Sequence, residues 1–393
     1  MRPSNLIAAG RKKPKLSRLR LVALIQLLLA GGNLASAKEF FVYFGTYTGG
    51  LSQGIYVSRL DADTGKLSAP ELAIATPSPC YLAIAPGEKF LYTADSVPKF
   101  NGESAGAISA FAIDHHSGHL TLLNRASAGG AGPCHVSVDA TGHVLMAANY
   151  NVGSVKSFRL NPDGTIGADG SYIQQQGTGP NTNRQAGPHA HAIYVDPSNG
   201  FALACDLGAD RVVIYRLDAT TGMLTRHSTA SVPAGGGARH LAFSPDGKFA
   251  HVINEMGCTV TTFAWNADTG ELTTVETVSA LPPGQGAQPP YTAAEILTAG
   301  HRVYATIRGH DSITAFAADQ QTGRLTFLQN VPDTGKVPRG MGIDPTGRWL
   351  IVGNQKTDNA VEYAIDPTTG KLSPTGLELK IGSPVDVKFV GVE

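Results

Sequence analysis

This sequence has no excess of one charge, no cysteine spacing typical of a disulfide framework and, after residue 37, no long helical patterns. Its 31 Lys and Arg residues are balanced by 31 Asp and Glu residues, so nothing favours nucleic acid or an anionic membrane surface as a partner. The four cysteines, Cys80, Cys134, Cys205 and Cys258, form no CxxC pair. We expect them to be buried small hydrophobic residues, although an exported chain could oxidise them. Without helical patterns after residue 37, the chain is predicted to be all-β.

The N-terminus differs from the rest of the chain. Basic residues between positions 11 and 20 precede an apolar run at 21–30, and Ala35-Ser36-Ala37 follows as a small-x-small site. This layout predicts a signal peptide at 1–37 and a mature domain at 38–393, exported to the periplasm or beyond. The alternatives are an uncleaved anchor, or a cytoplasmic protein whose start is mis-assigned. We expect no membrane association after cleavage.

A turn sequence repeats along the chain. "DADTGKL" at 61–67 returns in forms such as "DATTGML" at 218–224 and "DPTTGKL" at 366–372. Its glycines recur every 46 to 58 residues, at Gly65, Gly118, Gly164, Gly222, Gly270, Gly323 and Gly370. A period near this length with several strands per repeat is typical of a β-propeller, and seven copies predict seven blades.

Each blade is predicted to contain four antiparallel strands. Residues 133–176 hold one complete set, whereas residues 40–75 hold only a second, third and fourth strand. The missing first strand is found at the other end of the chain, in "SPVDVKFVGV". We therefore expect residues 383–391 to pair with the strand at 40–45, which closes the ring and removes its open edge.

Aligning the repeats identifies candidate site residues. First strands of propeller blades line the central channel, and their starts gather at one mouth. Polar residues at that mouth vary among the blades, and charged ones are poor core formers. The candidates for chemistry lie on three successive blades: His191, Arg239, Glu255 and Arg308. Nearby repeat positions give candidate substrate-binding residues: His135, Asn149, His240, Glu295 and Arg339.

Long segments resemble a known family. "GPHAHAIYVDP", "ARHLAFSPDGKFAHVINE" and "AAEILTAGHRVYATIRGHDSI" are similar to the seven-bladed propeller lactonases, which include bacterial 6-phosphogluconolactonases and fungal carboxymuconate cyclases. The resemblance covers residues 40–391 and implies a lactone-processing enzyme using one histidine, two arginines and a glutamate, which match His191, Arg239, Arg308 and Glu255. The turn after Ile296 is shorter than the family's usual one.

These residue types suit lactone hydrolysis. His191 is the expected general base, and Glu255 would orient it or share its role. Arg239 and Arg308 would stabilise the oxyanion and bind a phosphate or carboxylate group. Alternatively, Glu255 and Arg239 form a structural ion pair.

The second-strand ends also carry oxygen ligands that could suit a divalent cation: Asp95, Asn149, Asp206, Asn254 and Asn354. Two arginines at the same mouth would repel a cation, so we expect no metal and no other cofactor.

The sequence thus predicts a monomeric lactonase acting on a small-molecule lactone, most simply 6-phosphogluconolactone. The alternatives are an exported lactonase or cyclase acting on a non-phosphorylated or carboxylated lactone, and a non-catalytic propeller that only binds.

Overall fold

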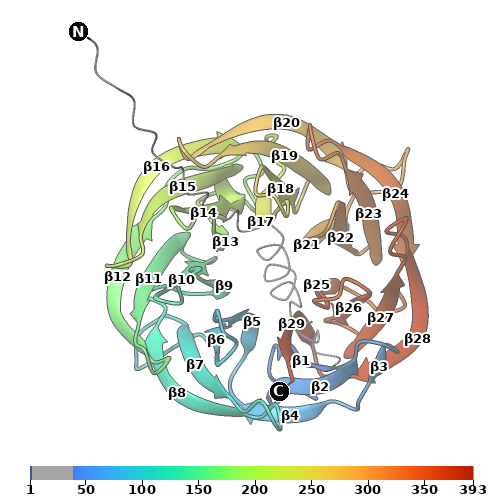
Figure 1. Cartoon of the computed structure of the whole chain (residues 1–393), viewed down its shortest axis with the longest axis horizontal. Coiled ribbons are helices and arrows are strands. Elements are labelled where there is room, and N and C mark those ends of the chain that lie inside the picture. Colours follow the sequence, from blue (N-terminus) through green and yellow to red (C-terminus); the bar gives the residue numbers. More distant parts are fainter. Residues whose placement is uncertain (2–38, 393) are drawn as a thin grey trace. The chain divides into compact units, whose positions relative to one another are not determined.

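The structure, a computed structural model, describes Met1 and residues 39–392. The predicted signal peptide lies outside these residues. From residue 39 onward the chain forms seven antiparallel sheets arranged radially around an axis (Figure 1). We number them as blades 1 to 7, starting with the blade that holds both chain ends. The predicted all-β, seven-bladed propeller is confirmed.

Blades 2 to 7 each use four consecutive strands, and the first strand is innermost (Figure 1). Blade 2 contains β5 (Pro79–Ile84), β6 (Phe90–Asp95), β7 (Ala107–Ile113) and β8 (Leu120–Ser127). Blade 3 contains β9 (Pro133–Val138), β10 (Val144–Asn149), β11 (Ser154–Leu160) and β12 (Ile166–Gln174). Blade 4 contains β13 (Ala190–Val195), β14 (Phe201–Asp206), the 3₁₀ turn η1 (Leu207–Ala209), β15 (Arg211–Asp218) and β16 (Met223–Ser231).

The remaining consecutive blades follow the same order. Blade 5 contains β17 (Ala238–Phe243), β18 (Phe249–Asn254), β19 (Thr259–Asn266) and β20 (Glu271–Ser279). Blade 6 contains β21 (Thr292–Ala299), β22 (Arg302–Arg308), β23 (Ser312–Ala318) and β24 (Leu325–Pro332). Blade 7 contains β25 (Pro338–Ile343), β26 (Trp349–Asn354), β27 (Asn359–Ile365) and β28 (Leu372–Lys380).

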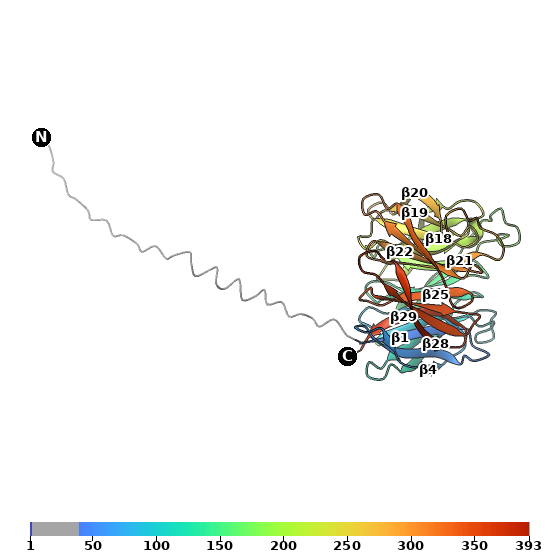
Figure 2. The same cartoon turned by 90° about the vertical axis from the view of Figure 1, so that its right-hand side faces the viewer.

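Blade 1 closes the ring with strands from both ends of the chain. Its inner strand β29 (Pro384–Gly391) pairs with β1 (Glu39–Thr46), from Phe40 opposite Gly391 to Gly45 opposite Asp386. Figure 2 shows these two strands side by side. The predicted closure is therefore confirmed.

The outer part of blade 1 differs from the expected single fourth strand. Two short segments, β3 (Lys66–Leu67) and β4 (Glu71–Ala75), both pair with β2 (Gly54–Asp61). Pro70 lies between them and has no backbone N–H to donate to the ladder. The fourth strand is therefore interrupted at that point.

The repeated turns join third and fourth strands and pack against the preceding blade. All seven turn glycines have φ between 68° and 81°, a conformation that residues with a Cβ rarely adopt. A Cβ on Gly270 would lie 2.2 Å from the Phe201 ring, and one on Gly323 would lie 2.3 Å from the Phe249 ring. Glycine is thus required both by the turn and by the close contact between blades.

All four cysteines are free thiols. Cys80, Cys205 and Cys258 are buried, as predicted, whereas Cys134 is half-buried. In the described part of the chain, no helix is long and apolar enough to cross a membrane.

Candidate active site

Bulges on the innermost strands position several candidate residues. In blade 5, Ala238 pairs with Asn254 and His240 pairs with Ile253, which leaves Arg239 as an extra residue. His191 in β13 and Arg339 in β25 are extra in the same way. A bulge locally redirects side chains. Repeat alignment places these residues at one mouth, and the bulges set where their side chains point.

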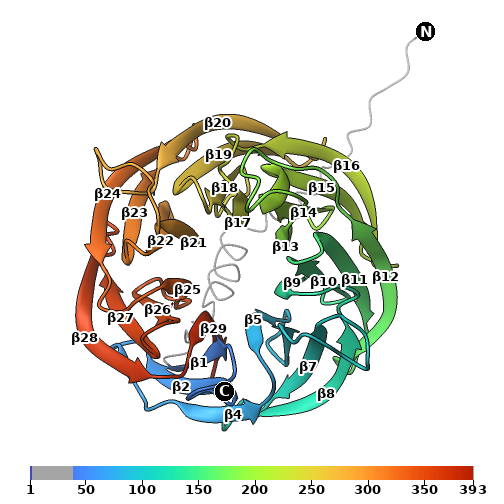
Figure 3. The ribbon, with the colours of Figure 1, turned by 180° about the vertical axis from the view of Figure 1, so that it is seen from behind.

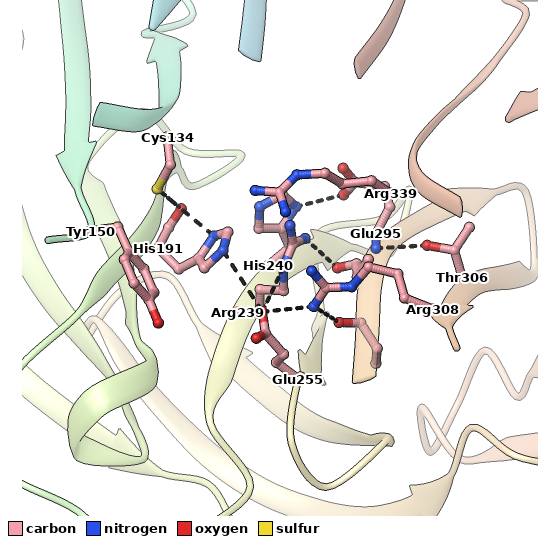
Figure 4. Close-up of polar contacts among 12 residues, drawn as sticks. Cys134, Tyr150, His191, Arg239, His240, Glu255, Glu295, Thr306, Arg308 and Arg339 are labelled. Carbon is pink, nitrogen blue, oxygen red and sulfur yellow. Dashed lines mark hydrogen bonds and ion pairs between the residues drawn. The ribbon is translucent and has the colours of Figure 1, made fainter. Parts of the chain in front are cut away.

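Glu255 is the centre of the cluster. Its carboxylate accepts a hydrogen bond from Arg239 Nε at 3.1 Å on Oε2, and Arg308 Nη2 lies 3.0 Å from the same oxygen. Arg184 Nη2 donates to Oε1 at 2.7 Å. Figure 4 shows Arg239 and Arg308 directed at this carboxylate. Three guanidinium groups thus converge on one carboxylate that is 4% exposed.

Glu255 remains ionised in this setting. Burial alone favours its neutral form, but the charges of Arg308 and Arg239 hold the pKa of Glu255 well below its usual range. Both carboxylate oxygens are engaged by arginines, and Oε2 lies 3.9 Å from His191 Nε2, which is longer than a hydrogen bond. In this geometry Glu255 holds the arginines in place and does not orient His191.

His191 is an uncharged imidazole that lines the pocket at the channel mouth. Its ring is buried, and burial together with the charge of Arg239 brings the pKa of His191 well below the ordinary imidazole value, against the opposing effect of Glu255. The imidazole is therefore neutral at pH 7 and has a nitrogen lone pair available.

A pocket of about 330 Å³ opens at this mouth. Its lining is mainly polar and includes Tyr47, Tyr150, Arg184, His191, Glu255, Arg308 and Arg339. Arg308 also donates to the Ala293 carbonyl at 2.9 Å. Arg339 instead donates to the Tyr47 hydroxyl at 3.2 Å, and its guanidinium lies 5.5 Å from the Tyr47 ring centroid.

Arg184 is a site residue that the sequence reasoning missed. It lies in the segment 175–189 that joins β12 to β13, and it also donates to the Tyr150 hydroxyl at 3.0 Å. Gln185 anchors this segment through bonds to the Leu207 carbonyl at 2.9 Å and Asp210 at 2.7 Å. The length of segment 175–189 could have indicated a functional loop, because it is the longest connection between successive blades.

Three of the predicted substrate-binding residues lie below the pocket, in the channel. His240 and Glu295 are both buried, with His240 Nδ1 2.8 Å from Glu295 Oε1. His135 stacks near Tyr81, with ring centroids 4.1 Å apart. These side chains do not line the pocket. They form a buried polar layer across the channel, where Nε2 of each histidine has no hydrogen-bond partner.

Asn149, the fourth predicted substrate-binding residue, forms hydrogen bonds within the fold. Its side-chain amide donates to the Ala128 carbonyl at 2.9 Å and to Ser154 Oγ at 3.0 Å. The structure therefore brings Arg339 to the pocket with His191, Glu255 and Arg308, and separates Asn149 from it. Arg239 contacts Glu255 from a buried position and does not itself line the pocket. His189 stacks on Tyr150 with ring centroids 4.6 Å apart.

Three of the other four residues weighed as oxygen ligands also bond within the fold, whereas the buried side-chain amide of Asn354 has no hydrogen-bond partner among the described residues. Asp95 accepts from Thr93 Oγ1 at 2.6 Å and from Ser109, and Asp206 accepts from the backbone N–H of His189 at 2.8 Å. Asn254 donates to Thr261 Oγ1 at 2.9 Å. Within residues 39–392, no cluster of three His, Cys, Asp or Glu side chains suits a metal ion.

This chain is similar to known proteins in both sequence and fold. The family described as "Lactonase, 7-bladed beta-propeller" matches residues 41–389. A Bacillus subtilis protein named 6-phosphogluconolactonase is 36% identical over 352 residues, covering 90% of this chain and 99% of the relative. The crystal structure of a putative 6-phosphogluconolactonase from Bacteroides fragilis is 33% identical with a TM-score of 0.82, covering 90% of this chain and 98% of the other.

A second solved structure is a periplasmic gluconolactonase from Pseudomonas aeruginosa. It is 30% identical with a TM-score of 0.83, covering 90% of this chain and all of the other.

Proposed function

The chain belongs to the seven-bladed β-propeller lactonases, and from this premise we propose that it hydrolyses a sugar lactone that carries an anionic group. The leading candidate is 6-phosphogluconolactone, the substrate implied by the names of its Bacillus and Bacteroides relatives. The reaction takes place in the polar pocket at the channel mouth.

The charge on the pocket is the observation that carries this proposal. Arg184, Arg239 and Arg308 share one carboxylate, Glu255. Arg339 adds a fourth guanidinium, bonded to the neutral Tyr47 hydroxyl. The pocket therefore has more positive than negative charge. A planar guanidinium binds phosphate or carboxylate through two parallel hydrogen bonds, so we assign the substrate anion to Arg339.

The residues divide the chemistry as follows. Neutral His191 takes a proton from water as the water oxygen attacks the lactone carbonyl carbon. Arg308, which lines the pocket and is fixed by Glu255, stabilises the negative charge that develops on the carbonyl oxygen, and Arg239, buried beside the same carboxylate, adds its positive charge. When the ring C–O bond breaks, the imidazolium of His191 returns its proton to the departing alkoxide. The product is the open-chain hydroxy acid.

A second candidate is an exported gluconolactonase acting on the neutral sugar lactone. It is favoured by the basic, apolar N-terminus of the chain and by the 30% identical periplasmic relative. We therefore also propose export. The test is to express the full-length chain and find where the protein accumulates. A periplasmic protein whose N-terminus has been cleaved near residue 37 would support export, and an unprocessed cytoplasmic protein would contradict it.

Arg339→Gln distinguishes the two substrates. We expect it to lower kcat/KM for 6-phosphogluconolactone by about 10²-fold, because a charge-assisted bidentate contact contributes roughly 1.5–3 kcal/mol. The rate with neutral glucono-lactone should change less than about threefold. Arg324→Gln, which removes an exposed arginine on blade 6, is the matched control. An equal loss on both lactones, or a wild-type preference for the neutral one, would contradict an anion site at Arg339.

A further inference from the structure

A second pocket lies between blades 5 and 6, on the face opposite the candidate active site. It measures about 290 Å³ and is lined by residues that include Ser244, Phe249, His251, Thr298, Val303 and Ala318. First strands begin at the active-site mouth, so the turns that follow them, such as 244–248, lie at the other face. Figures 1 and 3 show the two blades side by side.

The equivalent place between blades 4 and 5 is filled by an indole. Trp265 of blade 5 is 8% exposed and packs edge-on against Phe201, with ring centroids 5.5 Å apart. Phe243 lies on its other side, with a centroid separation of 6.1 Å. The indole Nε1 donates to Asp196 Oδ2 at 3.3 Å. Three aromatic rings and one hydrogen bond thus complete that interface.

Blade 6 has small residues where blade 5 has two of those rings. Trp265 stands five residues before turn glycine Gly270, and the residue five before Gly323 is Ala318. In every other blade the residue directly before the turn is a larger apolar one, namely Leu60, Ile113, Leu160, Leu217 and Ile365. Leu160 stands four residues before its glycine, because that turn is one residue shorter. Thr298 likewise takes the place of Phe243 on the inner strand.

The turn that would cover this region is also shortened. Ala299 pairs directly with Arg302, so β21 and β22 are joined only by Gly300 and His301. The other half of the interface is retained: Phe249 stands at the position of Phe201 and packs against its turn glycine in the same way. Three departures from the repeat therefore fall in one place, and together they open the pocket.

We propose that this pocket is a second small-molecule site, which binds a neutral or cationic planar aromatic compound of indole size with an N–H donor. The ring would lie against Phe249 in the position that Trp265 occupies one interface earlier. The N–H donor of the ligand would face Ser244, which stands at the repeat position of Asp196. The Ser244 hydroxyl donates to Asp246 at 2.7 Å.

The polar rim defines the class of ligand. Asp246 and Asp319 line the pocket, and hydrogen bonds lower the pKa of both carboxyl groups, with that of Asp246 at about 2. His251 lines the inner wall, where burial lowers its pKa to about 4, so the ring is uncharged. Arg302, also at the rim, is turned to the Thr368 and Thr369 carbonyls. Lys248 Nζ pairs with Asp246 at 3.1 Å, so the carboxylate of Asp319 is the rim charge that disfavours an aromatic acid.

Indole is the probe for this site. We expect saturating indole to raise the Tm of the wild-type protein by about 2–4 °C, as a ligand that binds only the folded state does. Ala318→Trp should raise Tm without ligand and abolish the indole effect, because its own ring fills the pocket. Ala318→Leu is a smaller replacement with the same expected direction, should the tryptophan disturb folding. Lactonase turnover should stay unchanged in both variants.

Ile365→Ala is the matched control. It makes the same truncation between blades 6 and 7, at a pocket of about 330 Å³ that Ile365 itself lines and where the long turn at 344–348 is kept. It should gain no additional indole response. Two results would overturn the proposal: no indole response in the wild type, or an Ala318→Trp variant that still responds to indole. An equal new response in Ile365→Ala would reduce the pocket to an adventitious cavity.

Discussion

At the scale of single residues, the site depends on how one carboxylate is shared. Burying an ionised group is costly unless it is paired and hydrogen-bonded. Glu255 meets that condition through Arg184, Arg239 and Arg308. The same arrangement leaves His191, 3.9 Å away, as an uncharged imidazole in the pocket. In the mechanism that we propose, the residue that accepts the proton and the residue that holds the cations are thus separate.

His191→Gln tests this division of roles. We expect kcat to fall by about 10²–10⁴ with little change in Tm, because general base catalysis is lost while the pocket remains. His189→Gln, two residues earlier and stacked on Tyr150, should cost less than about tenfold. Because burial and Arg239 lower the pKa of His191, wild-type kcat/KM should stay nearly constant from pH 8 down to pH 6.5. Equal losses in both variants, or an activity that falls already at pH 7, would refute the assignment.

At the scale of elements, β29 connects the two ends of the chain. It pairs with β1 in the ladder of blade 1 and supplies Asp386, which accepts a hydrogen bond from the Leu82 N–H of blade 2 at 2.8 Å. Without it, the inner edge of β1 would be unpaired and the neighbouring blades would lose a channel strand.

Deletion of residues 384–393 should lower Tm by roughly 10 °C or more, or leave the chain insoluble, since a strand of this size contributes several kcal/mol. Differential scanning calorimetry measures the change. Deletion of residue 393 alone, which leaves the pairing of β29 with β1 intact, is the control and should melt like the full chain. A shortened protein that melts within a degree or two of that control would contradict closure by β29.

At the scale of the whole molecule, buried carboxyl groups tie stability to pH. Burial raises the pKa of Glu362 in β27 to about 7, and the neighbouring Asp344 acts in the same direction. Burial likewise raises the pKa of Asp95 to about 6. The folded state therefore binds these protons more tightly than the unfolded state, and the stability that they contribute is lost as pH rises from about 4 to 7.

Glu362→Gln should stabilise the protein by about 1–3 kcal/mol at pH 8, where the wild type must hold a buried charge. At pH 4.5 the two proteins should be nearly equal. Denaturant unfolding at both pH values measures the difference, with Glu271→Gln on an exposed strand position as the control. A stabilisation that is the same at both pH values would rule out ionisation of Glu362 as its cause.

The sequence by itself determined the number of blades, the order of strands and the closure of the ring. Those features follow from local signals: a glycine that a tight turn requires, alternation along short strands, and a strand missing from one end and present at the other. Because repeats place equivalent residues at equivalent points, the sequence also placed His191, Arg239, Arg308 and Arg339 at one mouth.

Only the tertiary structure decided which of the candidates meet. Arg184 reaches Glu255 from a connection without a repeat partner, so alignment had no position to assign to it. His135 and His240 lie one residue beyond the bulges of their strands, and Glu295, at the equivalent repeat position, lies within the bulge of β21. All three lie in the channel below the pocket. The direction of a side chain beyond a bulge depends on packing between blades that are far apart in the sequence, and that packing exists only once the ring has closed.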